Sequence, residues 1–273
     1  MSDLTAVVQF KHREHRGLGY DTGYSTLGAF IIPRTESNVL PLADIRAHVF
    51  SNGYFASNLG IGCRFITKDD NFAVGANAFY DFRKWKDLYT SQFAAGLEIL
   101  TKIIDLRVNG YYPIGQRFKE KIHSLTTDGL TFQTRYALPA VDLELSGRAV
   151  TGSNFFQIHV GAGPYYLFKQ NAGRFPTGNA LGVRANAAFH FSKWFTLGAE
   201  YTYDPLFKAR FVGFVSLNIH LGKKERSPYK ETGKENIKEA FRVPKKEMNV
   251  RLQPIKRNEI IPMIRKRHTV SSL

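Results

Sequence analysis

Residues 72–114 read FAVGANAFYDFRKWKDLYTSQFAAGLEILTKIIDLRVNGYYPI. From residue 104 onward the side chains alternate, which is the two-residue period of a β-strand and not the 3.6-residue period of a helix. One set is apolar or small and the other is mostly charged or polar: Ile104, Leu106, Val108, Gly110 and Tyr112 against Asp105, Arg107, Asn109 and Tyr111. The stretch therefore predicts a strand with one apolar and one polar face.

The run that precedes it has the same period, with Phe93, Ala95, Leu97 and Ile99 on the apolar side. A tight turn is predicted at Leu100 and Thr101, between the two runs, which makes them an antiparallel hairpin. Residues 84–89 are expected to form a longer connection at the opposite end of the strands. Alternation of short and long connections is typical of outer-membrane barrels.

The same alternation recurs along the chain. Residues 129–150 are predicted to form one long strand kinked at Pro139, because proline lacks a ladder donor; two separate strands are the alternative. Residues 115–128 are predicted to be a long polar loop. Together with the hairpin, the expected total is twelve strands, the others being 6–14, 24–33, 42–50, 55–67, 72–83, 155–168, 180–191, 194–203 and 209–222.

Composition limits the class of protein. A chain of 273 residues and 31.0 kDa has room for one large β domain or two small ones. Its single cysteine, Cys63, excludes an internal disulfide and a cysteine-built metal site. No apolar run is long enough for a transmembrane helix. The first residues also lack the apolar core of a signal peptide, so we expect either a cytosolic protein or a chain without its natural start.

Charge is spread unevenly along the chain. Residues 223–273 hold 15 Lys and Arg against 6 Asp and Glu, a net of +9, which leaves +6 of the total +15 for residues 1–222. A basic tail of this kind is usually a solvated segment. Its acids are interleaved with its bases and aromatics are few, so no nucleic-acid partner is expected.

The distribution of residues between the two faces favours a membrane barrel over a soluble one. A soluble barrel fills its interior with large apolar side chains and has Lys and Glu outside. Here the polar face carries both signs of charge within single strands, and the apolar face runs without charge for the length of a tilted membrane strand. We predict that the lumen is lined by Asp44, Arg46, His48, Glu98, Asp105, Arg107, Asn109, Asp142, Glu144, Arg148, Arg184, Asn186 and Glu200.

Aromatic residues gather near the predicted strand ends, where interfacial girdles lie in membrane barrels. They include Tyr80, Phe82, Tyr111, Tyr112, Tyr165, Tyr166, Phe191, Trp194, Phe195, Tyr201 and Tyr203. Aromatics in the core of a soluble barrel are the alternative explanation. The alternation and the girdles together predict an all-β, twelve-stranded antiparallel transmembrane β-barrel with a basic C-terminal tail, in contact with outer-membrane lipid.

The motifs of residues 72–114 resemble those of the inverse autotransporter barrels, the translocator domains of intimin and invasin. In that family an aromatic-Asp strand end leads to a Gly- and Glu-containing strand, a very tight turn and an N-G-Y-x-P strand. The matching residues here are Asn77, Phe79, Tyr80, Asp81, Gly96, Glu98, Asn109, Gly110, Tyr111 and Pro113. The resemblance extends over roughly residues 17–222.

The tail is also similar to that family, since PIKRNEII at 254–261 matches a V-x-R-N-x-x-I-V stretch that follows the barrel. The resemblance implies that the chain re-enters the pore after the last strand and carries a passenger outward, and that the barrel-assembly machinery is a partner. Residues 234–241 have helical spacing and are a candidate for a pore segment, with a disordered basic tail as the alternative. Lys and Arg of the tail are expected to pair with Asp44, Glu98, Asp105, Glu144 and Glu200.

Catalytic chemistry is not expected. The histidines lack an H-x-x-H or H-E-x-x-H pattern, so no metal and no cofactor are predicted. The glycine-rich stretches GLGYDTG and VGAGP do not lead into a helix as a phosphate loop would. No serine has the context of a nucleophile elbow. We therefore expect a non-enzymatic protein.

These observations predict a bacterial outer-membrane barrel over residues 1–222 and a basic tail or linker over 223–273 that threads or plugs the pore. The expected function is to anchor and export the C-terminal segment. The immunoglobulin-like repeats of intimin and invasin do not occur in these residues, so adhesion is not carried over, although a role as an adhesin anchor stays open. A free-standing channel or structural barrel passing small solutes is the alternative, a soluble binding barrel is the third reading, and the surface partner is unknown.

Overall fold

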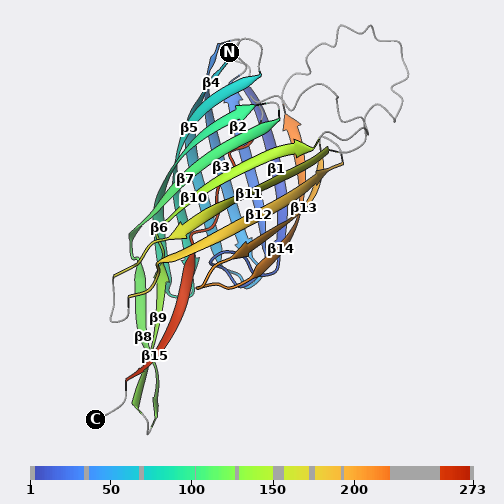
Figure 1. The fold of residues 1–273 in the computed structure, drawn as a ribbon. Helices are drawn as coiled ribbons and strands as arrows, with labels where there is room; N and C mark the ends of the chain where they lie inside the picture. The colour runs from blue at the N-terminus through green and yellow to red at the C-terminus, as the bar shows by residue number, and fades with distance from the viewer. Residues whose placement is uncertain are drawn as a thin grey trace, which may run out of the picture.

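A computed structural model describes residues 4–33, 37–67, 71–101, 103–126, 129–149, 157–171, 176–191, 194–221 and 253–270. Within them the fold is all-β, and twelve strands close into one antiparallel barrel (Figure 1). The barrel strands are β1 (Leu4–Glu14), β2 (Tyr24–Pro33), β3 (Val39–Phe50), β4 (Phe55–Ile66), β5 (Phe72–Trp85), β6 (Leu88–Thr101), β7 (Ile104–Gly115), β10 (Ala140–Ala149), β11 (Gln157–Leu167), β12 (Ala180–His190), β13 (Phe195–Tyr203) and β14 (Arg210–Leu221). The predicted fold class is confirmed.

The barrel closes because β1 pairs with β2 on one side and with β14 on the other. Ala6 stands opposite Leu221, so the first and last barrel strands meet at the same rim, which we call the N-terminal rim. The opposite end of the barrel is called the hairpin rim. Closure leaves no strand edge in the wall, which is the condition for a sheet to lie in hydrocarbon.

Most wall strands have an apolar outer face and an inner face that carries their charged and polar side chains, whereas β2 also turns Phe30 and Ile32 inward. In β6 burial alternates along the whole strand, and Leu97 is 64% exposed whereas its neighbour Glu98 is 3% exposed. In β3 Ile45 is 48% exposed whereas Asp44 is 2% exposed. A barrel with apolar residues outside and charged residues inside is suited to lipid and not to water.

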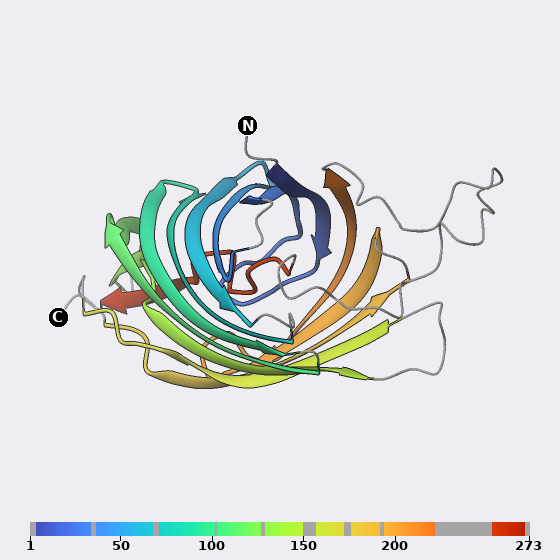
Figure 2. The ribbon, with the colours of Figure 1, turned by 90° about the horizontal axis from the view of Figure 1, so that it is seen from above.

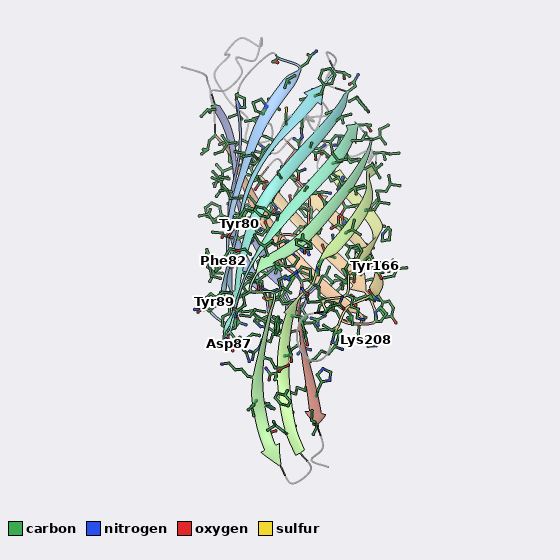
Figure 3. The ribbon with its side chains drawn as sticks, turned by 90° about the vertical axis from the view of Figure 1, so that its left-hand side faces the viewer. Tyr80, Phe82, Asp87, Tyr89, Tyr166 and Lys208 are labelled. Carbon is green, nitrogen blue, oxygen red and sulfur yellow. The ribbon has the colours of Figure 1, made fainter. Side chains whose placement is uncertain are left out.

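Aromatic side chains lie on the outer wall near the hairpin rim. Figure 3 places Tyr80, Phe82, Tyr89 and Tyr166 on the wall, with Asp87 and Lys208 beyond them toward the rim. Aromatics followed by charges are what the boundary between hydrocarbon and water favours. Two residues predicted for the girdles lie elsewhere: Tyr111 and Tyr165 are buried in the interior. Among the described residues, no helix is long and apolar enough to cross a bilayer.

The prediction of a single kinked strand over residues 129–150 is wrong. Residues Gly129–Ala137 form β9 and Ala140–Ala149 form β10, and only β10 belongs to the barrel. The chain divides at Pro139, which cannot donate to a ladder. The alternative of two strands therefore holds, and the barrel still has twelve because β9 lies outside the wall.

The predicted polar loop over residues 115–128 is also wrong, since Phe118–Thr126 form β8, which pairs with β9. Strand β7 pairs directly with β10, from Tyr111 opposite Ala140 to Ile104 opposite Gly147. The β8–β9 hairpin therefore projects from the wall at the hairpin rim. Strand β15 (Met263–Val270) pairs with β9, and the three strands form a separate sheet (Figure 1).

The connection predicted over residues 84–89 is shorter than expected. Trp85 pairs with Leu88, so the turn consists of Lys86 and Asp87 alone. Lys86 has a φ of 55°, a left-handed conformation suited to a two-residue hairpin turn. The strand alternation of this hairpin continues up to the turn. The charged residues of KWKD at 84–87 resemble a loop in the sequence because they lie beyond the aromatic belt, where charge is favoured.

Candidate functional site in the barrel lumen

Residues 253–262, here called the lumen segment, lie inside the barrel (Figure 2). Its contacts advance along the barrel axis. Gln253 bonds Arg107 near the start of β7, Ile261 bonds Arg83 near the end of β5, and Pro262 then leads into β15 beyond the hairpin rim. Strand β14 ends at the N-terminal rim, the lumen segment lies within the barrel, and β15 lies beyond the hairpin rim.

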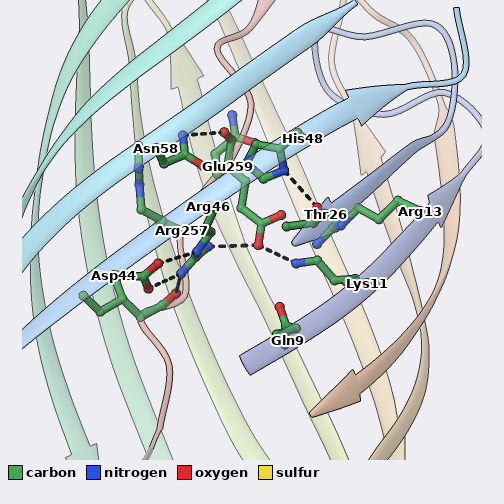
Figure 4. A network of polar contacts seen from close by, with 12 residues as sticks. Gln9, Lys11, Arg13, Thr26, Asp44, Arg46, His48, Asn58, Arg257 and Glu259 are labelled. Atoms are coloured by element: carbon green, nitrogen blue, oxygen red, sulfur yellow. Dashed lines mark hydrogen bonds and ion pairs between the residues drawn. The ribbon is translucent and has the colours of Figure 1, made fainter. Parts of the chain in front are cut away.

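Glu259 is held by cations from two wall strands (Figure 4). Its carboxylate pairs with Lys11 of β1 and lies 2.9 Å from Arg46 of β3. Tyr24 of β2 donates to the other carboxylate oxygen at 3.3 Å. All of these side chains are largely removed from solvent. The negative charge of Glu259 is therefore stabilised by the wall side chains and not by water.

Arg46 connects the wall to two points of the lumen segment. It binds the carboxylate of Asp44 in a bidentate manner, at 2.7 and 2.6 Å. It also donates to the backbone carbonyl of Ile255 at 2.7 Å. Asn58 of β4 adds a further wall contact by donating to the backbone carbonyl of Glu259 at 2.9 Å. The backbone and the side chains of the segment are thus both recognised.

Arg257 occupies a slot in the wall formed by β5, β6 and β7. Its guanidinium forms a bidentate pair with Asp81, and both side chains are 1% exposed. The guanidinium carbon lies 4.2 Å from the ring centre of Phe79 and 5.4 Å from that of Tyr111. A planar cation between two aromatic rings and a carboxylate is a geometry that Arg satisfies and Lys does not.

The strand register explains how the slot is built. Phe79 stands opposite Ala94, and Ala94 stands opposite Tyr111, so the three side chains form one row across β5, β6 and β7. The small side chain of Ala94 leaves room between the two rings. Two residues along β5, Asp81 accepts from Asn58 at 2.8 Å and from Gln92 at 2.9 Å, which fixes the carboxylate that receives Arg257.

The remaining residues of the segment contact other parts of the wall. Lys256 lies 3.7 Å from Glu144 of β10 and 2.8 Å from a ring nitrogen of His159 of β11. The amide of Asn258 donates to the hydroxyl of Tyr111 at 2.8 Å, and that hydroxyl donates to Asp142. The segment is therefore bonded to strands on both sides of the lumen.

The loop between β1 and β2 contacts the chain where the lumen segment leaves the barrel at the hairpin rim. The carbonyl of Gly19 accepts from Met263 at 3.3 Å and from Arg83 at 2.8 Å. Gly19 has a φ of 78°, and a Cβ at this position would lie 2.4 Å from the Cα of Pro262. Only glycine provides both this conformation and this approach of two backbones.

The residues predicted for the lumen lie on the inner face of the wall, and most pair with one another. Asp105 binds Arg107 at 3.2 Å, Asp142 accepts from Asn109 at 2.8 Å, and Glu144 accepts from Asn186 at 3.1 Å. The other pairs are Glu98 with Arg64, Arg148 with Asp105, Arg184 with Asp142, Glu200 with Arg13, and His48 with Thr26 and Asn58. Of the five acids expected to meet tail cations, Glu144 is the one with such a contact among the described residues.

The motif residues fall in two rows of the wall. Asn77, Gly96 and Asn109 stand in register, and a Cβ on Gly96 would lie 2.4 Å from the amide oxygen of Asn109. The second row is the Phe79, Ala94 and Tyr111 slot, with Asp81 beside it. Pro113 is buried two residues after Tyr111, and Gly110 is half-buried.

Several contact residues were not anticipated from the sequence. Lys11, Tyr24, Asn58 and Arg83 are not among the predicted lumen residues, and the predicted tail contacts involve Lys and Arg and not Glu259. The alternation of Gln9, Lys11 and Arg13 in the first strand is a signal for Lys11, although β1 has only weak strand periodicity. Residues 234–241, proposed for the pore, lie outside the described residues. Within the described residues, no group of three or more His, Cys, Asp or Glu is placed to hold a metal.

Comparison with known proteins gives a family match and several fold matches. A family model described as inverse autotransporter, beta-domain, matches residues 21–202. A solved structure described as "Unveiling the Mechanism Behind the in-meso Crystallization of Membrane Proteins" is 14% identical, with 95% of this chain and 100% of that chain covered and a TM-score of 0.66. At this identity the likeness concerns the fold alone.

Two further solved structures are more distant. The COG4313 outer membrane channel from Pseudomonas putida F1 is 10% identical, with 80% of this chain and 96% of that chain covered and a TM-score of 0.48. The translocator domain of the autotransporter NalP from Neisseria meningitidis is 14% identical, with 80% and 88% covered and a TM-score of 0.37. No curated protein matches the chain.

Proposed function

The chain belongs to the inverse autotransporter β-domain family, and from this membership we propose that its outer-membrane barrel exports and anchors its own C-terminal segment. The family indicates a transport or anchoring barrel and not an enzyme. The proposal divides the chain into a barrel over residues 1–222 and a tail over 223–273 that crosses the pore. The observation that carries it is the lumen segment, whose charged side chains pair with the wall from inside the barrel.

In this proposal the polar lining serves two successive purposes. While the chain moves, the paired charges of the wall provide a hydrated path in which an extended polypeptide satisfies its backbone by bonding water and side chains. When the lumen segment arrives, its three charged residues meet wall groups of suitable charge or hydrogen-bonding capacity: Lys256 with Glu144, Arg257 with Asp81, and Glu259 with Lys11 and Arg46. Movement stops because all of these contacts form together.

The arrest is specific for one register of the chain. Successive residues of an extended chain point in different directions, so a shift by one residue would turn Arg257 away from the Asp81 slot. The same shift would place Lys256 or Asn258 at a site shaped for a planar guanidinium. We therefore assign to Arg257 and Glu259 the role of setting how much chain remains outside.

The barrel is proposed to reach the membrane with the help of the barrel-assembly machinery. Support comes from the family membership and from the closed wall, which must form before or during entry into lipid. The N-terminal rim then faces the periplasm and the hairpin rim faces outward.

Surface labelling of intact cells tests the proposal. An epitope fused after Leu273 is expected to bind antibody and to be removed by added protease, because β15 lies beyond the hairpin rim. As a control, an epitope inserted in the β6–β7 turn at the N-terminal rim should stay inaccessible until the outer membrane is permeabilised. If the terminal epitope is reached only after permeabilisation, the export proposal is wrong.

A further inference from the structure

The β8–β9 hairpin contributes nothing to closure of the barrel. Strand β7 pairs directly with β10, and the hairpin projects beyond the rim between them. A projecting hairpin presents a strand edge, which is a template for pairing with another strand. In the structure the edge of β9 that faces away from β8 is occupied by β15.

The pairing of β15 begins where the lumen segment leaves the barrel. The amide of Leu138 donates to the carbonyl of Pro262 at 2.9 Å, and the ladder continues from Met263 opposite Ala137 to Val270 opposite Leu130. Since alternate amides of an antiparallel strand point the same way, the amides of Tyr136, Thr134 and Phe132 share the direction of Leu138 and face β15. The residues that follow Pro262 thus lie beside the backbone amides and carbonyls of the β9 edge directly outside the hairpin rim.

The hairpin is held in place by contacts that do not involve β15. Asp87, in the β5–β6 turn, pairs with Arg135 of β9 and lies 2.8 Å from Lys121 of β8. The rings of Phe118 and Tyr136 stack with centres 6.4 Å apart. The amide of Ala137 donates to the carbonyl of Arg117 at 2.9 Å. The edge of β9 is therefore positioned by the barrel and by β8.

We propose that the β8–β9 hairpin is an acceptor that captures residues Met263–Val270 of the same chain as they emerge, by adding them to its edge as a third strand. This inference rests on the proposed export function and names what retains the exported chain. Each residue pair that forms outside the barrel must be broken before the chain can slide back into the lumen. Capture therefore makes the outward position of the chain persistent.

Two proline variants of β15 separate capture from other effects. In β15 the amides of Ile264, Lys266 and His268 face β9, because their partners are Tyr136, Thr134 and Phe132. The amide of Arg267 faces away from β9. Lys266→Pro therefore removes a ladder donor, whereas Arg267→Pro introduces the same ring and loses the same positive charge at an edge position where proline is tolerated.

The experiment follows the epitope after Leu273 on intact cells after a pulse of synthesis. We expect Lys266→Pro to slow its appearance, or to lower the exposed fraction, by about fivefold, with Arg267→Pro close to the unsubstituted chain. Barrel folding is checked by heat-modifiable electrophoretic mobility, which neither variant should change because β15 lies outside the wall. Equal exposure in both variants, or equal impairment of both, would overturn capture.

Failure of capture and failure of export give different results. If the epitope of the unsubstituted chain never reaches the surface, the export function itself is wrong. If that epitope is exposed and Lys266→Pro behaves like Arg267→Pro, export stands and the hairpin is not its acceptor.

Discussion

The side chain of Arg257 is enclosed by the wall and is 1% exposed, whereas that of Glu259 is 7% exposed. The charge of Arg257 is compensated by Asp81, and the rings of Phe79 and Tyr111 lie against its guanidinium. Burial removes the water that would otherwise solvate the guanidinium. The pair is therefore expected to matter far more than an ion pair at the surface.

We predict that Asp81→Asn destabilises the docked lumen segment by about 3–5 kcal/mol, because it leaves a buried guanidinium without its counter-charge. Hydrogen exchange of the amides at 255–261 in detergent measures the effect. The double variant Asp81→Asn with Arg257→Met should recover part of the loss, because it removes both buried charges.

A partly exposed pair of the same chemistry provides the control. Asp21 lies 3.1 Å from Arg210, with the Asp21 side chain 53% exposed. Asp21→Asn should alter the same exchange rates little, as is usual for surface pairs. Equal effects of the two Asp→Asn variants would contradict the assignment of Arg257 to a buried slot.

Ala94 provides a second prediction at this scale, because its small side chain keeps the slot open between Phe79 and Tyr111. Ala94→Leu should displace Arg257 and destabilise docking by about 1–3 kcal/mol through overpacking. Ala95→Leu is the matched control, since Ala95 is exposed on the outer face, where lipid tolerates leucine. The measurement is again exchange at 255–261, and a greater loss in Ala95→Leu would refute the slot.

At the scale of elements, the β8–β9 hairpin depends on the turn that carries Asp87. Partial burial of Asp87 acts to raise its pKa, but the hydrogen bond from Lys121 and the charge of Arg135 outweigh it, so the pKa of Asp87 lies below its usual range. A carboxyl group with a depressed pKa in the folded state contributes stability above its unfolded pKa of about 3.9, and the contribution is lost as pH falls through the folded value.

We therefore predict that protection of the β8 and β9 amides decreases as the pH is lowered through that acidic range. In Asp87→Asn the β8 and β9 amides should be less protected from exchange already at neutral pH. Their protection should then no longer decrease with the protonation of residue 87. Amides of β6 distant from the turn serve as the internal reference. A variant that retains the full pH dependence would show that other carboxyl groups are responsible.

At the scale of the whole molecule, the lumen segment lies across the path that a solute would take. Its contacts reach β1, β3, β4, β5, β7, β10 and β11, so it bridges opposite parts of the wall. A barrel acting as a free-standing solute channel would not need a segment bonded in this way. Conductance therefore distinguishes an arrested export pore from an open channel.

We predict that the full chain in planar bilayers conducts poorly and that a chain ending at Leu221 conducts at least several-fold more, because removal of the tail leaves a polar lumen lined by charges. Single-channel recording measures both, with heat-modifiable mobility as the check that the shortened barrel has folded. High and equal conductance in the two chains would favour the solute channel.

The sequence alone was sufficient to predict most of the wall. In β3, β6 and β7 the period of two assigns each side chain to a face, because backbone geometry forces neighbours to opposite sides of a strand. The charged set and the apolar set then indicate lipid outside and polar groups inside. Asp81, Tyr111 and Glu98 could be singled out because they lie in a local motif.

Other features required the tertiary structure. The alternation of residues 129–150 is the same whether the strand lies in the wall or outside it, so the exit of β9 was not visible in the local pattern. Arg257 and Asp81 are 176 positions apart, and a charge pattern does not specify which partner a distant tail will meet. Local periodicity determined which way each strand faces, whereas the burial of charges, the closure of β1 on β14 and the course of the tail depend on contacts between remote segments, which form only when the whole chain is folded.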